Sequence, residues 1–327
     1  MQNGYPETLL EAVRYYSDPD VCQDFMVAMR WPDGVVTCPQ CGRNDPRYLA
    51  NARLWECRNK HPRKKFSIKV GTIFEDSPIP LTKWLPAVWL IANDKNGISS
   101  YEVHRALGVT QKTAWFLLHR IRLAMQDGSI EKMSGTVEAD ETFIGGKARN
   151  MHKDVRARKI TGTGGSGKTV VAGLLERHTQ PHSKVKVAVK PDRTRATLHP
   201  FVRDHVETGS ELFTDALLSY RGLEAEYTHA FIDHAEKYVE GRVHTNGMEN
   251  FWSLLKRALG GTYVSVEPFH MFRYLDEEAF RFNERGGKDS DRFQKVIAST
   301  PGRRITYRQL TGKDAVDSDK GAVSVEG

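Results

Sequence analysis

The chain has 327 residues, and its 48 lysines and arginines exceed its 41 aspartates and glutamates by a net charge of +7. Hydrophobic residues make up 39% and charged residues 27%, which is typical of a folded protein and argues against global disorder. The longest apolar run, 84–92, is far shorter than the ~20 residues of a membrane span. The N-terminus has no secretory pattern, and four cysteines are too few for a disulfide scaffold, so we expect a cytoplasmic protein without membrane contact.

The first predicted element is a helical segment over 1–34. Its apolar residues recur at spacings of three and four, as they do on one face of a helix. They are Leu9, Leu10, Val13, Tyr16, Cys22, Phe25, Met26 and Met29. Because Cys22 lies inside this apolar pattern, we interpret it as a core thiol and not as a metal ligand.

A turn-rich segment over 35–75 has the ligand spacing of a zinc ribbon. Cys38-Pro-Gln-Cys41 lets two thiolates converge on one ion, and the glycine that follows permits a tight turn. Cys57 follows at the expected distance, and although position 60 holds no fourth cysteine, His61 is within reach. These four residues predict a tetrahedral Cys₃His zinc site, with a chance Cys-x-x-Cys beside a surface histidine as the alternative.

Cationic side chains surround this predicted zinc site, and Glu56 alone opposes them. They are Arg53, Arg58, Lys60, Arg63, Lys64 and Lys65. A cationic rim of this kind suits contact with nucleic-acid phosphates, and a solvated charge run is the alternative.

Residues 80–127 predict a DNA-binding helix-turn-helix. Ser99 and Glu102 match a capping box, Gly108 makes the turn, and Thr110 can cap the second helix. The apolar stripe of that second helix faces inward and leaves outward a set of donors suited to phosphates and base edges. The donors are Gln111, Lys112, Trp115, His119 and Arg122. We predict that the last four contact DNA, and an ordinary helical hairpin is the alternative.

Strand-like runs come first and helices later between 133 and 286, which predicts a mixed α/β domain. The expected strands are 136–144, 168–175, 185–189, 211–214 and 228–232, and the expected helices are 195–206, 220–226, 247–259 and 268–283. After Gly286 the chain turns polar, so we expect a C-terminal polar tail over 287–327.

The run Gly162–Thr169 fits the phosphate-binding pattern GxxxxGK[ST]. A working P-loop needs a buried strand before it and a helix after it. The residues before this run are basic, and those after it predict another strand. We therefore expect a flexible basic loop between two strands, and no nucleotide cofactor.

Acidic side chains lie inside or at the end of two predicted strands. Glu138 and Asp140 share one face of the first strand and Glu141 takes the other, because successive strand residues alternate. An acidic strand interior is costly unless the carboxylates are solvated, paired or bound to metal. A second apolar strand ends at Asp215, in the position where α/β folds place ligands.

The helix expected from 247 places Glu249, Ser253 and Lys256 on one face, so that a carboxylate and a cation lie two turns apart. Two strand aspartates and one helix glutamate can hold two Mg²⁺ ions ~3.5–4 Å apart, because magnesium prefers oxygen ligands. Such a pair activates a water or a 3′-hydroxyl for in-line attack on a phosphodiester. From spacing alone, ordinary surface acids are the alternative, since 41 acids provide many such triplets.

At this point the sequence resembles the bacterial insertion-sequence transposases that carry a zinc ribbon and an ISXO-like DDE domain, over roughly residues 20–285. The motifs are Cys-Pro-Gln-Cys-Gly (38–42), Phe-Ser-Ile-Lys-Val-Gly-Thr-Ile-Phe (66–74), Glu-Ala-Asp-Glu-Thr-Phe-Ile-Gly-Gly-Lys (138–147), Thr-Asp (214–215), His-Thr-Asn-Gly-Met-Glu-Asn-Phe-Trp-Ser-Leu-Leu-Lys-Arg (244–257) and Arg-Phe-Asn (281–283). Together they are highly specific, whereas several are weak singly. The family implies a ribonuclease-H-like fold, with which the expected order of strands and helices agrees.

By this resemblance Asp140 and Asp215 are the first and second catalytic aspartates, Glu249 is the third carboxylate, and the three would hold Mg²⁺ or Mn²⁺. Lys256 would contact a phosphate at the DNA end, and we expect Arg257 beside it to bind DNA as well.

The third metal ligand has rivals, because some members of this family are described with asparagine in that role. Asn246 and Asn250 are both near enough in sequence. We favour Glu249, because a carboxylate neutralises the charge of the ion and an amide does not. Glu138 and Glu141 are expected to support the site or the fold.

The resemblance implies a DNA transposase. Its zinc ribbon and helix-turn-helix would recognise terminal inverted repeats, and its DDE domain would nick the ends and join them to target DNA. Transposases of this kind usually act as dimers or larger assemblies, because two ends must be brought together. The alternatives are a non-catalytic zinc-ribbon DNA-binding regulator, an inactive transposase copy, and a nuclease or resolvase of the same fold.

Overall fold

The computed structural model describes residues 4–146, 152–154, 157, 165, 167–177, 182–215, 217–232 and 243–312. The chain forms two compact units, of which the first combines Met1–Gln126 with Gly287–Gly327 and the second is Asp127–Gly286. No helix in the described ranges is both long and apolar enough to cross a membrane.

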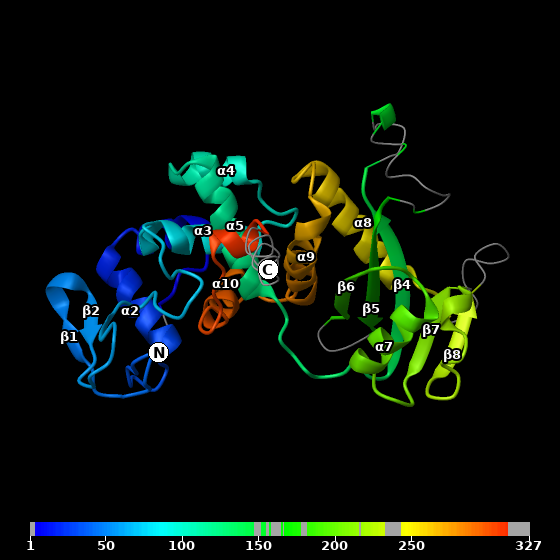
Figure 1. Cartoon of the computed structure of the whole chain (residues 1–327), viewed down its shortest axis with the longest axis horizontal. Coiled ribbons are helices and arrows are strands. Elements are labelled where there is room, and N and C mark those ends of the chain that lie inside the picture. Colours follow the sequence, from blue (N-terminus) through cyan, green and yellow to red (C-terminus); the bar gives the residue numbers. More distant parts are fainter. Residues whose placement is uncertain are drawn as a thin grey trace, which may run out of the picture. The chain divides into compact units, whose positions relative to one another are not determined.

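The first unit begins with two helices and a small three-stranded antiparallel sheet (Figure 1). Thr8 starts the first helix with a capping box, and Asp18 starts the second by accepting a hydrogen bond from the backbone of Asp20. The elements are α1 (Leu9–Tyr15), α2 (Pro19–Arg30), β1 (Arg47–Leu49), η1 (Ala50–Ala52), β2 (Leu54–Glu56) and β3 (Lys65–Phe66). The helical segment predicted within 1–34 is confirmed by α1 and α2.

Three helices follow: α3 (Leu81–Asn93), α4 (Ser100–Leu107) and α5 (Gln111–Met125). The capping box at Ser99 is present, and Gly108 has the left-handed backbone, φ 59°, that lets the chain turn sharply between α4 and α5. The Thr110 side chain accepts a hydrogen bond from the backbone N–H of Thr113, which caps α5. The predicted pair of capped helices is therefore confirmed.

The chain after Gly286 differs from the polar tail that the sequence predicts. Residues Asp289–Ala298 form α10, and Tyr307–Leu310 form the short α11. Phe293 on α10 is 1% exposed, and its ring lies 5.7 Å from that of Phe25 and 5.1 Å from that of Trp89. The prediction is wrong here because three buried apolar residues at helical spacing, within a mostly polar segment, complete the core of the first unit. The rest of the expected tail, 313–327, lies outside the described residues.

The second unit is built on a five-stranded mixed sheet with the strand order β6-β5-β4-β7-β8. The pairs β4–β5 and β5–β6 are antiparallel, whereas β4–β7 and β7–β8 are parallel. The strands are β4 (Thr136–Ile144), β5 (Thr169–Glu176), β6 (Lys184–Lys190), β7 (Glu211–Asp215) and β8 (Thr228–Ile232). The glycine-rich run leads directly into β5, as predicted, although its residues 162–164 and 166 lie outside the described part.

Helices cover both faces of this sheet (Figure 1). Apolar residues of α8 and α9 pack on one face, and those of α7 pack on the other. Asn283, the last residue of α9, bonds the backbone N–H and C=O of Val185 at distances of 2.7 and 3.0 Å, and so satisfies the edge strand β6. The remaining elements are α7 (Arg195–His205), η3 (Leu218–Tyr220), α8 (Asn246–Gly261), η4 (Pro268–His270) and α9 (Met271–Asn283).

Truncating the buried ring of α10 tests whether this helix belongs to the first unit's core. We expect Phe293→Ala to lower the free energy of unfolding by about 3–5 kcal/mol, because a buried aromatic side chain is replaced by a cavity. Tryptophan fluorescence during urea unfolding reports this transition, since every tryptophan except Trp252 belongs to the first unit. The control Tyr101→Ala removes a ring that is 62% exposed and should change stability by less than about 0.5 kcal/mol. Equal midpoints for Phe293→Ala and the unchanged protein would contradict the packing of α10.

Candidate active site and metal centre

The pairing of β4 with β7 brings the two predicted aspartates together. Glu138 is the parallel partner of Phe213, and Asp140 and Asp215 lie two residues further along their respective strands. Neighbouring strands are ~4.8 Å apart, and side chains two residues apart share a face. Both aspartates therefore belong to the sheet face that α8 covers, and the charge of Asp215 acts on Asp140.

The carboxylate of Asp140 is held by two donors. The backbone N–H of Glu141 donates to Oδ1 at 2.8 Å, and the indole Nε1–H of Trp252 donates to Oδ2 at 2.9 Å. The pKa of Asp140 is raised to about 6, chiefly by burial; the two donors lower it, and the negative charges of Asp215 and Glu249 contribute to the rise. The site therefore concentrates negative charge in a poorly hydrated position, which a bound cation would relieve.

Helix α8 carries the third predicted carboxylate. Glu249, Ser253 and Lys256 are exposed on one face of this helix, as predicted, while Phe251 and Leu255 are buried on the other. Glu249 lies near enough for its charge to act on Asp140. The rival ligands and the predicted DNA contact on this helix, Asn246, Asn250 and Arg257, are exposed as well.

The three carboxylates come from two strands and a helix. Among the described residues, Asp140, Asp215 and Glu249 are not a set whose ligand atoms all lie within 4.8 Å of one another.

Glu138 has a different environment from Asp140, although both lie on the same face of β4. Its side chain is 1% exposed and accepts hydrogen bonds from Arg177 Nε at 2.6 Å and from the backbone N–H of Met248 at 2.8 Å. The second bond satisfies a free N–H in the first turn of α8. A Cβ on Gly247 would lie 2.9 Å from the Glu138 carboxylate, so a larger residue there would push against this contact. Glu138 therefore attaches the start of α8 to the sheet.

Glu141 lies on the opposite face of β4, as predicted, and accepts a hydrogen bond from the hydroxyl of Tyr220. Burial raises the pKa of Glu141 to about 8, which indicates a carboxyl that is largely neutral at pH 7. Sequence reasoning missed the partners of these acids, namely Trp252, Arg177 and Tyr220. Trp252 stands in a quoted motif, but nothing in the sequence indicates that its ring reaches a strand.

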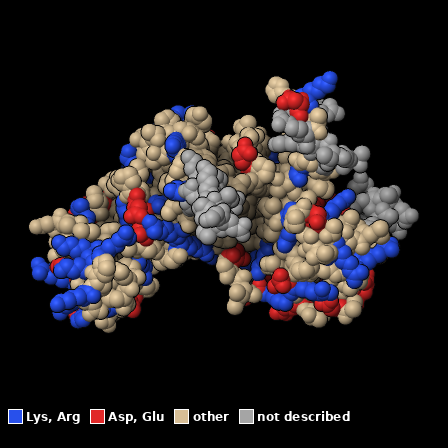
Figure 2. All heavy atoms as spheres, viewed as in Figure 1, with Lys and Arg blue, Asp and Glu red and all other residues tan. Residues whose placement is uncertain are grey.

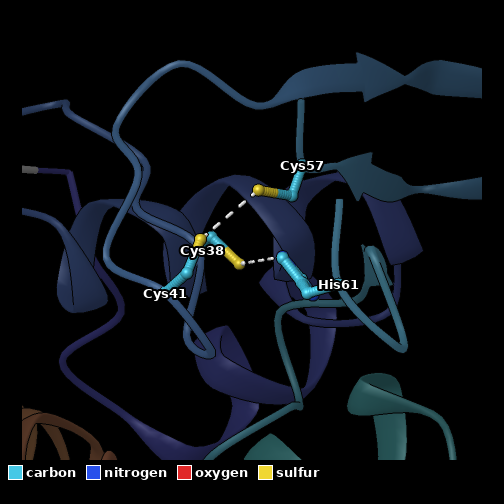
Figure 3. A group of neighbouring side chains, drawn as sticks. All are labelled: Cys38, Cys41, Cys57 and His61. Carbon is cyan, nitrogen blue, oxygen red and sulfur yellow. Dashed lines mark hydrogen bonds between the residues drawn. The ribbon is translucent and has the colours of Figure 1, made fainter. Parts of the chain in front are cut away.

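The three predicted cysteine ligands and His61 converge in the first unit (Figure 3). Cys38 Sγ lies 3.6 Å from His61 Nε2, and Cys41 Sγ lies 3.6 Å from Cys57 Sγ. A tetrahedral zinc ion separates its sulfur and nitrogen ligands by about 3.6–3.8 Å, given Zn–S bonds of about 2.3 Å. The donor set and its spacing therefore fit zinc.

Hydrogen bonds around this cluster prepare its members for a metal. The backbone N–H of Arg43, followed by neighbouring thiols and the Asn59 amide, lowers the pKa of Cys41 to about 7, which favours the thiolate. His61 Nδ1 lies 2.8 Å from the carbonyl oxygen of Pro62, which leaves Nε2 directed at Cys38. All four cysteines are outside disulfides, and Cys22 is buried among the α2 core residues, as predicted.

The predicted DNA-contact residues of α5 divide into two groups. Lys112 is exposed and Trp115 is half-buried, but His119 is 0% and Arg122 1% exposed. The prediction that His119 and Arg122 face outward is therefore wrong. The prediction assumed that α5 buries a single apolar stripe, which would leave these two positions exposed. Three helices of its own unit, α3, α4 and α10, contact α5, so it buries more than one face.

Exposed cations gather around the Cys₃His cluster. Figure 2 shows Lys and Arg side chains over the part of the first unit that contains β1 and β2. A hollow beside Cys57 and His61 has a mainly cationic lining. Its charged residues are Arg47, Arg58, Lys60, Lys64 and Glu56.

Comparison with known families accounts for both parts of the chain. Residues 132–283 match the ISXO2-like transposase domain, and residues 17–59 match the transposase zinc-ribbon domain. The chain belongs to the ISXO2-like transposase family. Its five-stranded mixed sheet flanked by helices is consistent with the ribonuclease-H-like fold of a DDE domain. The zinc-ribbon match begins before the predicted 35–75 and takes in α2.

Two relatives show how far this similarity extends. An uncharacterized protein in transposable element ISH50 of Halobacterium salinarum is 25% identical over 274 residues, which cover 79% of this chain and 90% of the relative. An uncharacterized transposase-like protein of Haemophilus influenzae is 36% identical over 101 residues, which cover 31% of this chain and 81% of the relative. The family supports a role as a transposase that acts on DNA.

Removing the Glu138 carboxylate should release the start of α8. We expect Glu138→Ala to cost about 3–5 kcal/mol, because Arg177 is left buried without its anionic partner. The backbone amides in the first turn of α8 should then exchange with deuterium at least about 100-fold faster, measured by mass spectrometry. Glu138→Gln retains an acceptor for Met248 and should show a smaller increase. Unchanged protection of this turn in Glu138→Ala would contradict the assigned contact.

Proposed function

We propose that this transposase cleaves and joins DNA by metal-ion catalysis at Asp140, Asp215 and Glu249. The observation that carries the proposal is the parallel pairing of β4 with β7, which leaves Asp215 close enough for its charge to act on Asp140, beneath a helix whose Glu249 also acts electrostatically on Asp140. Oxygen ligands of this kind fit Mg²⁺ or Mn²⁺. Glu249 is preferred to Asn246 and Asn250 because its charge offsets that of the ions.

The proposed chemistry is phosphodiester exchange. A pair of bound divalent ions would supply an activated water or 3′-hydroxyl and would stabilise the leaving oxygen. Asp140 and Asp215 would orient the reacting groups from the rigid sheet, and Glu249 would close the site from α8. Lys256 and Arg257, exposed further along α8, would contact phosphates of the DNA end.

The first unit is proposed to recognise the terminal inverted repeats. Cys38, Cys41, Cys57 and His61 would hold a structural zinc ion, around which the cations of the ribbon contact DNA phosphates. The α4–α5 pair would approach the duplex through residues such as Lys112. Because two ends must be joined in one event, we propose that the active form is a dimer or a larger homo-oligomer.

A strand-transfer assay tests the proposed catalytic residues. Labelled DNA ends from beside the gene and a target plasmid are mixed with protein and Mg²⁺ or Mn²⁺. We expect Asp140→Asn, Asp215→Asn and Glu249→Gln each to lower the joining rate at least about 1,000-fold, because a lost metal ligand removes several kcal/mol of transition-state stabilisation. Glu207→Gln, which changes an exposed acid of the same unit, serves as the control.

The outcomes separate the proposal from its rivals. If Glu249→Gln remains active while Asn246→Ala or Asn250→Ala does not, the third ligand is the asparagine. Cutting without joining would indicate a nuclease or resolvase. Binding of the ends with neither cutting nor joining would indicate a regulator or an inactive copy.

Zinc content tests the proposed role of the Cys₃His cluster. We expect the purified protein to contain one zinc ion per chain and Cys57→Ser to lose it, because three remaining ligands hold the ion poorly and metal binding supplies the folding energy of such small modules. Elemental analysis measures the zinc content, and fluorescence anisotropy measures the affinity for DNA ends. Both should fall in Cys57→Ser. Cys22→Ala removes a buried thiol outside the cluster and should keep its zinc. Full zinc content in Cys57→Ser would disprove the assigned ligand set.

A further inference from the structure

We propose that Trp252 is a positioning residue of the active site, whose indole N–H holds the Asp140 carboxylate in one orientation, and that Gly173 provides the space this contact needs. The inference rests on the proposed function of Asp140 as a metal ligand. It adds an explanation of how the Asp140 carboxylate is held in the orientation needed to bind a metal ion.

Among the described residues, each oxygen of Asp140 accepts one hydrogen bond, and both donors are rigid. Oδ1 accepts from the backbone N–H of Glu141 on the same strand, at 2.8 Å. Oδ2 accepts from Trp252 Nε1 at 2.9 Å, and the tryptophan side chain is 4% exposed in the core between α8 and the sheet. Because each carboxylate oxygen has two lone pairs, the donors prevent rotation and still leave each oxygen one lone pair for a metal ion.

The indole reaches Asp140 because the neighbouring strand has no side chain at that point. Gly173 on β5 is the register partner of Asp140 on β4. A Cβ at Gly173 would lie 2.7 Å from Cζ2 and Cη2 of Trp252 and 2.3 Å from Cε of Met248. Real side chains do not approach this closely, so any larger residue would displace the indole. Gly173 does not have a positive φ, so its role here is clearance and not backbone freedom.

The position of Trp252 on α8 connects the orientation of one carboxylate with the position of another. Trp252 and Glu249 are three residues apart on the same helix, and Met248 of that helix is bonded to Glu138. A shift of α8 would therefore move Glu249 and withdraw the donor from Asp140 at the same time. The contact lets β4 and α8 present both carboxylates in a single arrangement.

The direct test removes the N–H and keeps the aromatic ring. Trp252→Phe is the simple variant, and replacement of Trp252 by benzothienylalanine through amber suppression changes only the N–H to sulfur. Binding of Mn²⁺ to the zinc-loaded protein is followed by electron paramagnetic resonance of the free ion, which requires no activity. Strand transfer is measured over a range of Mn²⁺ concentrations.

We expect both replacements to weaken Mn²⁺ binding about 10- to 100-fold, the usual effect of losing a donor that orients a metal ligand, and to raise by the same factor the Mn²⁺ needed for half-maximal joining. Gly173→Ala should have the same effect by displacing the indole. The control Phe251→Leu changes the neighbouring core residue, which is 1% exposed, and should lower stability without altering Mn²⁺ binding.

The results distinguish this proposal from the one on which it rests. Mn²⁺ binding and joining that are unchanged in the benzothienylalanine protein would overturn the role of Trp252, because that protein keeps the shape of the core. If Asp140→Asn binds Mn²⁺ as tightly as the unchanged protein, the proposed function of Asp140 fails and the inference fails with it. A loss in Asp140→Asn with a smaller loss in the Trp252 proteins supports both.

Discussion

The candidate site depends on the parallel pairing of β4 with β7. The register pairs Glu138 with Phe213, and two residues further along each strand the charge of Asp215 acts on Asp140. A shift of one residue would send one of the aspartates to the opposite face of the sheet. Burial then raises the pKa of Asp140, and the nearby carboxylates add to the cost of its charge. A divalent cation would reverse that cost, which is why the arrangement suits metal binding.

The acids of β4 show how one short sequence supplies different chemistry on a strand. Glu138 is neutralised by Arg177 and caps α8, Asp140 faces the other carboxylates, and Glu141 bonds Tyr220 on the far side. Strand alternation places Glu141 on the opposite face from Glu138 and Asp140. Glu138 and Asp140 differ in the part of α8 that they contact, which is the backbone of Met248 for Glu138 and the indole of Trp252 for Asp140. Glu138 has a buried arginine as its partner and Glu141 a tyrosine hydroxyl, whereas Asp140 is held by a backbone and an indole N–H, which suits its proposed role as a metal ligand.

The first unit faces a different constraint, which is the small size of its sheet. Strands of two or three residues cannot bury enough apolar surface to be stable alone. The rings of Trp55 and Phe66 stack at 5.9 Å across the small sheet, and α10 adds Phe293 to the helical core of the same unit. The unit that carries the proposed DNA contacts therefore has two further sources of stability. One is the set of residues that could hold zinc, and the other is the C-terminal segment that packs on its helices.

The sequence by itself determined the features that depend on neighbours along the chain. The capping box at Ser99, the turn at Gly108 and the spacing of the cysteines all follow from local geometry, and the alternation of acids on β4 needs nothing beyond the period of a strand. Only the tertiary structure decided the burial of His119, the place of Phe293 in a core and the contact of Trp252 with Asp140. A periodic pattern defines which face of a helix a residue occupies, but the exposure of that face depends on which distant segment packs against it.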